Sequence, residues 1–135
     1  MGINLIIFAS IIFMLLGCGH IFLTLCTNLL EPKDDELLSL NKASYSRITD
    51  QTTLWNGGVG FHISHSIGLL FFGLFYLALS IDNAELITSS AIFSILIILI
   101  PLVYLFLSIK YWFIAPTVSI GLACFCYVLG LLMLN

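Results

Sequence analysis

The chain has 135 residues, of which 61% are hydrophobic and only 8% are charged, and its mean hydropathy is +1.17. Soluble domains carry about 25% charged residues, so this composition excludes an ordinary soluble domain and indicates an integral membrane protein. The formal net charge of −3 argues against nucleic acid as a partner. The length fits a single domain over residues 1–135, and the four cysteines, which form no CxxC pair, are expected to be free thiols.

Four apolar segments are long enough to cross a bilayer core of about 30 Å, and they lie at about 3–27, 57–80, 87–109 and 112–134. The breaks between the last three are short and require antiparallel neighbours. The sequence therefore predicts an all-α integral membrane protein, an antiparallel bundle of four transmembrane helices. The first segment lacks a basic start and is longer than the apolar run of a signal peptide, so it is assigned as a span, with secretory cleavage as the alternative.

The link between the first two spans, at about 28–56, is the only long one. Pro32 and the acidic residues beside it suit the start of a helix, and leucines at 37, 38 and 40 supply a short apolar face. The link is therefore predicted to hold a short amphipathic helix at Asp35–Ser46, lying on the bundle or on the lipid headgroups. The Leu54-Trp55 pair that follows is typical of an interfacial anchor.

The four basic residues all fall on one side of the predicted bundle. Lys33, Lys42 and Arg47 lie in the long link, and Lys110 lies in the turn between the last two spans. The positive-inside rule then places the 28–56 link in the cytoplasm and both termini outside, in a plasma or inner membrane.

Polar side chains from all four spans recur at one depth, roughly 7–12 Å from the basic side at 1.5 Å per residue. These candidates for a ligand or pocket are His20, His62, Ser64, His65, Ser66, Tyr104, Thr117 and Ser119. Such groups are costly to expose to lipid, so the pattern predicts one polar layer that forms a pocket, meets a partner or holds a bound group. No carboxylate lies within a span to assist acid–base or serine chemistry, and no catalytic residue is assigned.

The leading interpretation of the histidines is structural: their imidazoles would bond to Ser64, Ser66, Thr24 or backbone carbonyls and hold helices together. A lipid or small-molecule pocket and a proton path are alternatives. The most favoured function is non-catalytic, with the histidine-containing layer binding a lipid-like ligand or docking onto a partner membrane complex as an accessory subunit. Membrane lipids, a partner membrane protein or a second copy of the chain are the expected partners.

The competing hypothesis is a membrane redox protein that binds haem b or a metal ion. Two helices that offer imidazoles at equal depth meet the requirement for bis-histidine haem, so His20 with His65 or His62 would supply the axial ligands. The same three histidines are the candidate ligands of a metal ion.

Small residues recur every four positions on the second span, at Gly60, Ser64 and Gly68. Such a stripe lets two helices approach closely, so it is predicted to form the closest helix contact of that span. Pro101 and Pro116 are expected to kink the third and fourth spans near the polar layer.

Three motifs follow one another along the chain: Gly17-Cys18-Gly19-His20; Thr53-Leu54-Trp55 leading into GFHISHSIG at 60–68; and Tyr111-Trp112-Phe113 before Pro116. In this order they resemble the small four-span membrane proteins grouped as the LIC_13387 family, over most of the chain and most specifically in the SHSxG segment. The resemblance implies the four-span architecture and no particular activity. Asparagine is common in that family at the position of His62, which implies that His20 and His65 matter more as ligands.

Overall fold

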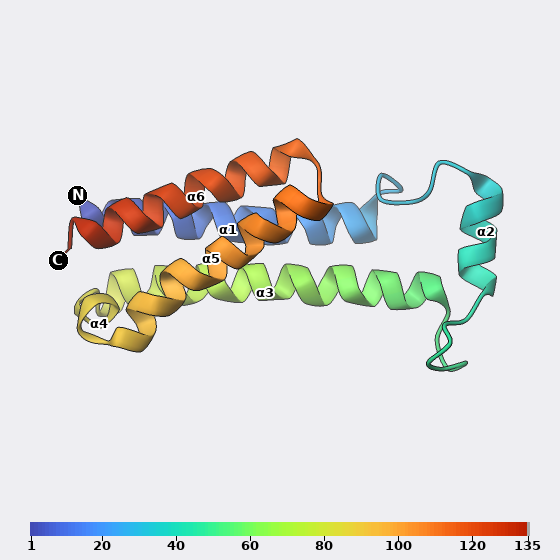
Figure 1. Ribbon diagram of the computed structural model, residues 1–135, viewed down its shortest axis with the longest axis horizontal. Coiled ribbons are helices and arrows are strands. Elements are labelled where there is room, and N and C mark those ends of the chain that lie inside the picture. The colour runs from blue at the N-terminus through green and yellow to red at the C-terminus, as the bar shows by residue number, and fades with distance from the viewer. Residues whose placement is uncertain (135) are drawn as a thin grey trace. The chain divides into compact units, whose positions relative to one another are not determined.

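The computed structural model describes residues 1–134, and over these residues the chain is built from helices without a strand. In chain order they are α1 (Gly2–Cys26), α2 (Asp35–Ala43), α3 (Leu54–Asp82), α4 (Glu85–Ser89), α5 (Ala91–Tyr111) and α6 (Ile114–Leu132), as Figure 1 shows. Within this described part, four helices, α1, α3, α5 and α6, are long and apolar enough to cross a membrane. The predicted all-α fold with four spans is confirmed.

The structure corrects the start of the third span, which was predicted at residue 87. Ser90 adopts an extended conformation, with φ −97° and ψ 113°, and separates the short helix α4 from α5. Hydroxyl groups bond the backbone around this break: Ser94 Oγ donates to the carbonyl of Ile87 at 2.6 Å, and Tyr76 OH donates to that of Phe93 at 2.8 Å. The spanning helix therefore begins only at Ala91.

Two further boundaries shift because a residue is extended. Phe113 caps α6, so this helix begins at Ile114 instead of 112, and Pro116 falls in its first turn. A proline there removes no intrahelical hydrogen bond, so the predicted kink at Pro116 is wrong. Extended Ser44 likewise ends α2 at Ala43, before the predicted Ser46. Pro101 lies buried inside α5, which continues through it as a helix.

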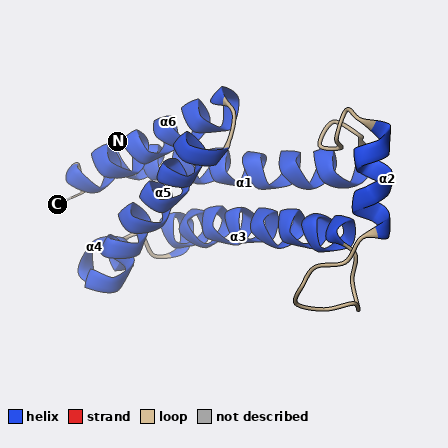
Figure 2. Ribbon diagram, turned by 45° about the vertical axis from the view of Figure 1, so that its right-hand side comes forward, coloured by secondary structure: helices blue, strands red, loops and turns tan. Residues whose placement is uncertain are grey.

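The chain divides into two compact units, Met1–Leu16 with Leu69–Asn135, and Gly17–Gly68. Helices α1 and α3 contribute residues to both units. The first unit also contains α4, α5 and α6. The second contains α2 and the loops on either side of it, which are drawn in tan in Figure 2.

The first unit has an aromatic core. The rings of Phe13, Phe72, Tyr76 and Tyr127 pack against one another with centroids 5.0–6.1 Å apart. The hydroxyl of Tyr127 meets Ser10 Oγ at 3.0 Å, while Ser10 also donates to its own helix. Ser10 and Tyr127 thus bring polar atoms into this core as hydrogen-bonded groups, as an apolar surrounding requires.

A close backbone approach on α3 lies at Gly73, in the first unit. A Cβ built on Gly73 would lie only 2.6 Å from the carbonyl oxygen of Ser10, so this glycine lets α1 and α3 come close together. The predicted stripe of Gly60, Ser64 and Gly68 is exposed instead, and a Cβ on Gly60 would meet nothing within 4 Å. The role of the stripe as the closest helix contact of this span stays a prediction, and Gly73 makes a close approach to α1.

In the second unit, the end of α1 and the start of α3 run side by side, and α2 lies across their ends (Figures 1 and 2). The side chain of Asp34 accepts hydrogen bonds from two backbone N–H groups and caps α2, as an N-terminal aspartate should. The loop after α2 is closed where the N–H of Leu54 donates to the carbonyl of Ser44 at 2.9 Å. This closure fixes the place at which α3, and Trp55 in its first turn, begins.

Candidate functional site

The three histidines gather between α1 and α3 in the second unit. Nε2 of His20 and Nδ1 of His62 are 3.1 Å apart, a hydrogen bond between two imidazoles. One ring must donate and the other accept, so at least one of the two is neutral. The ring of His65 meets that of His20 edge-on at 5.9 Å between centroids, and it stacks on Phe61 at 6.3 Å.

Two hydroxyl groups form hydrogen bonds to the backbone of the paired histidines. Thr24 Oγ1 donates to the backbone carbonyl of His20, and Ser66 Oγ donates to that of His62, each at 2.7 Å. Each hydroxyl lies four residues after its histidine, so the bond closes over one helical turn. The sequence predicted that the imidazoles would bond to these hydroxyls or to backbone carbonyls and so hold helices together. In the structure the hydroxyls of Thr24 and Ser66 donate to backbone carbonyls, and the imidazoles of His20 and His62 bond to each other across the two helices.

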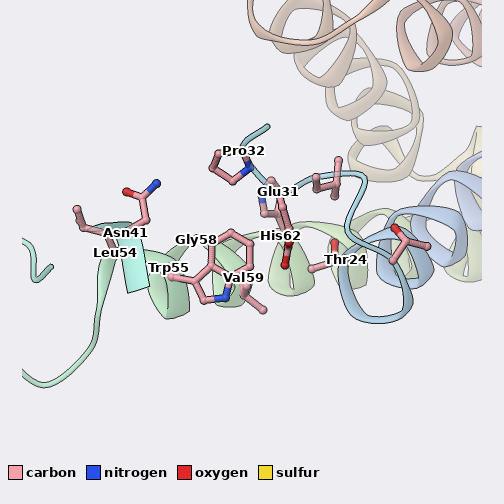
Figure 3. Close-up of a pocket in the computed structure, with 11 residues that line it drawn as sticks. Thr24, Glu31, Pro32, Asn41, Leu54, Trp55, Gly58, Val59 and His62 are labelled. Atoms are coloured by element: carbon pink, nitrogen blue, oxygen red, sulfur yellow. The ribbon is translucent and has the colours of Figure 1, made fainter. Parts of the chain in front are cut away.

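A cavity of about 240 Å³ opens beside His62 in the same unit. Its lining comes from the end of α1, the link, α2 and the start of α3, as Figure 3 shows. The lining residues are Thr24, Thr27, Leu30, Glu31, Pro32, Asn41, Leu54, Trp55, Gly58, Val59 and His62. Because Nδ1 of His62 bonds to His20, Nε2 is the ring nitrogen left for a ligand.

Of the predicted site residues, His62 alone is among those that line the cavity in the described part of the chain. His20 and His65 lie in the cluster next to His62. Ser66 is fully buried and bonded, and exposed Ser64 donates to the carbonyl of Phe61. The implied ranking of His62 below the other histidines therefore finds no support in the geometry.

Tyr104, Thr117 and Ser119 belong to the first unit. The ring of Tyr104 meets Phe13 edge-on at 6.0 Å. The hydroxyls of Thr117 and Ser119 donate to carbonyls one turn earlier on α6. That all four spans share one polar layer stays a prediction.

Most of the lining residues were not among the site residues predicted from the sequence. Trp55 was assigned as an interfacial anchor and Glu31 only as part of a helix start. A signal was present: hydroxyl-bearing Thr24 and Thr27 end one span at the level where Trp55 begins the next. Two spans joined by a link must meet the link at the same membrane face. The sequence therefore indicates that the two threonines and Trp55 lie at one level.

The spacing of His20 and His62 does not fit two axial ligands of one haem iron. Two axial nitrogens on opposite sides of an iron would be about 4 Å apart, at bond lengths of about 2 Å, and the His20–His62 nitrogens are 3.1 Å apart. Within residues 1–134, no three His, Cys, Asp or Glu side chains converge as they would on a metal ion. The cavity is also smaller than the roughly 300–1,000 Å³ typical of drug-sized ligands, so it suits a headgroup better than a macrocycle.

Comparison with known proteins does not assign the chain to a family. No family model, curated protein or solved structure matches the chain. The resemblance to the four-span family therefore stays a prediction, and function is argued from the site.

Proposed function

We propose that this chain is a small multi-pass membrane protein that binds a lipid-like ligand, with the polar end of that ligand in the cavity beside His62. The observation that carries this proposal is the mixed lining. Leu30, Leu54 and Val59 supply apolar surface, and Thr24 and His62 supply polar groups. An amphipathic molecule matches both parts of such a pocket.

The position of the cavity in the chain supports the same ligand class. It lies where two spanning helices end, next to the link, so a molecule anchored in the bilayer reaches it without leaving the membrane. Exposed apolar side chains continue away from it along the helices, among them Phe22 on α1 and Phe61 on α3. Acyl chains pack on such surfaces.

We further propose that the 28–56 link lies in the cytoplasm and both termini lie outside. The link holds Lys33, Lys42 and Arg47, and basic residues accumulate on the cytoplasmic side of membrane proteins. The cavity would then open at the cytoplasmic leaflet, whose lipids are the candidates for the ligand.

Two adjacent glycines offer a direct test. Gly58 lines the cavity and Gly57 does not, and a Cβ at either would meet nothing within 4 Å. Gly58→Leu should therefore fill the cavity without straining the backbone, while Gly57→Leu serves as the matched control. The full chain is purified in mild detergent, and bound lipid is quantified by native mass spectrometry. We expect lipid on the wild type and on Gly57→Leu, and its loss on Gly58→Leu; equal lipid on all three would contradict the proposal.

A second role, docking onto a partner membrane protein or a second copy, is favoured by one observation. The small-residue stripe at Gly60, Ser64 and Gly68 is exposed, so it is open to a helix from another chain. Crosslinking of the full chain in membranes through a cysteine at Ser64, in a background without Cys18 and Cys26, tests it. A crosslinked species supports docking, and a monomer alone speaks against a homo-oligomer at this face.

A further inference from the structure

The polar part of the cavity is rich in hydrogen-bond acceptors. Thr24 Oγ1 donates its proton to the carbonyl of His20, and Thr27 Oγ1 donates to that of Leu23, each at 2.7 Å. The oxygens of both hydroxyls therefore present lone pairs to a ligand. The carboxylate of Glu31 adds acceptors and a negative charge, and none of the lining residues that the structure describes is Lys or Arg.

An aromatic wall complements this charge. Trp55 lines the cavity, and its indole ring already attracts one cation, because Nζ of Lys42 lies 5.1 Å from the ring centroid. Tryptophan is the side chain that attracts cations best through its ring face. A carboxylate and an indole in one cavity both favour a positively charged group.

The edge of the cavity, in contrast, carries a positively charged side chain that can bind an anion. Lys42 follows the lining residue Asn41 on α2 and packs on the lining residue Trp55, so its ammonium group is placed at the rim. It is exposed, and so it can meet an anion at the membrane surface. Acceptors inside and a cation at the rim match a ligand that is positive at its tip and negative next to it.

On these grounds we infer that the ligand is a lipid with a primary ammonium joined to a phosphate, a headgroup of the phosphatidylethanolamine type. The ammonium would donate to Glu31 and the threonine oxygens, and the phosphate would lie near Lys42. A primary ammonium has three N–H donors for these acceptors. A quaternary ammonium has none and relies on a cage of several Trp, Tyr or Phe rings, whereas the lining that the structure describes contains Trp55 and no Tyr or Phe. This inference rests on the proposed function, since it names the headgroup of the same lipid.

The test uses the full chain in detergent, titrated with short-chain phosphatidylethanolamine, phosphatidylcholine, phosphatidylglycerol and diacylglycerol, and with soluble phosphoethanolamine. Binding is followed by native mass spectrometry. We expect phosphatidylethanolamine to bind at least about tenfold more tightly than the other lipids, which is the weight of one hydrogen bond to a charged group. Glu31→Gln should remove that preference, and Glu36→Gln, which changes a carboxylate outside the lining, should keep it.

The outcomes separate the two proposals. Equal binding of phosphatidylethanolamine and phosphatidylglycerol, or an unchanged preference in Glu31→Gln, would overturn the headgroup assignment and leave a lipid-binding protein. Binding of soluble phosphoethanolamine without any lipid would keep the headgroup chemistry and overturn the lipid. If none of the probes binds, diacylglycerol included, both proposals fail.

Discussion

His20 and His62, 42 positions apart in the chain, join α1 to α3 by a hydrogen bond of 3.1 Å between Nε2 and Nδ1. Each histidine's backbone carbonyl accepts a hydroxyl from the next turn of its helix. The pair thus links two helices and carries one member, His62, into the lining of the cavity. One side chain thus makes the interhelical bond and forms part of the cavity wall.

This bond should contribute measurably to stability. Interhelical hydrogen bonds in membranes average about 0.6 kcal/mol because the unfolded chain also finds partners there. A double-mutant cycle with His20→Ala, His62→Ala and both changes together should give a coupling energy near that value. Unfolding of the purified chain in mixed micelles measures it. A cycle of His20 with Ser64, whose hydroxyl bonds within its own helix, is the control, and coupling no larger than in that control would contradict the prediction.

The two glycine environments of α3 should respond oppositely to alanine. Gly73→Ala would push a Cβ to 2.6 Å from the backbone oxygen of Ser10, so α1 and α3 must separate, at a cost of about 1–3 kcal/mol. Gly60→Ala meets nothing within 4 Å and should be neutral or stabilising, by up to about 1 kcal/mol from helix propensity. Measuring the free energy of unfolding of each variant tests this difference. Equal destabilisation by both would mean that Gly60 also makes a close contact.

In the core of the first unit, the ring of Tyr127 should matter more than its hydroxyl. Tyr127→Phe removes the bond to Ser10, but Ser10 keeps its bond to the carbonyl of Ile6, so we expect a loss of only about 0.5–1.5 kcal/mol. Tyr127→Ala also removes the contacts with Phe13, Phe72 and Tyr76 and should cost about 3–5 kcal/mol. Thermal unfolding of both variants, compared with the wild type, tests the order. A hydroxyl loss as severe as the ring loss would contradict it.

The orientation in the membrane can be read by cysteine labelling. In a background without Cys18 and Cys26, which are exposed free thiols, a cysteine at Asn83 should react with an impermeant reagent applied to intact cells. A cysteine at Asp50, in the link, should react only after permeabilisation, because the proposed topology places that link in the cytoplasm. The reverse pattern would invert the proposed topology.

The four spans could be predicted from the sequence because they depend on composition alone. A long apolar run without charge forms a helix in a bilayer whatever its neighbours are, since a helix satisfies the backbone groups within the segment itself. Boundaries such as Ser90 and Phe113 escaped prediction. They are set by single extended residues and, at Ser90, by hydroxyl bonds from Ser94 and Tyr76.

The proximity of the three histidines could also be predicted from the sequence, but their bonding partners could not. Equal depth placed His20 beside His62 and His65, because the span ends align the helices along the membrane normal. Which group each imidazole would bind could not be derived from depth. The partner of an imidazole depends on the rotation of its helix about the helix axis. In the structure His20 bonds to His62.

What only the tertiary structure decided is the set of faces that meet. The spanning helices are apolar on nearly every side, so no periodic stripe marks the buried one, and a four-residue spacing of small residues pointed to Gly60 although the close approach lies at Gly73. The cavity was hidden for a related reason. Its lining joins the link to two helix ends, and the path of a link is set by particular bonds, such as the one from Leu54 to Ser44, that no local pattern encodes.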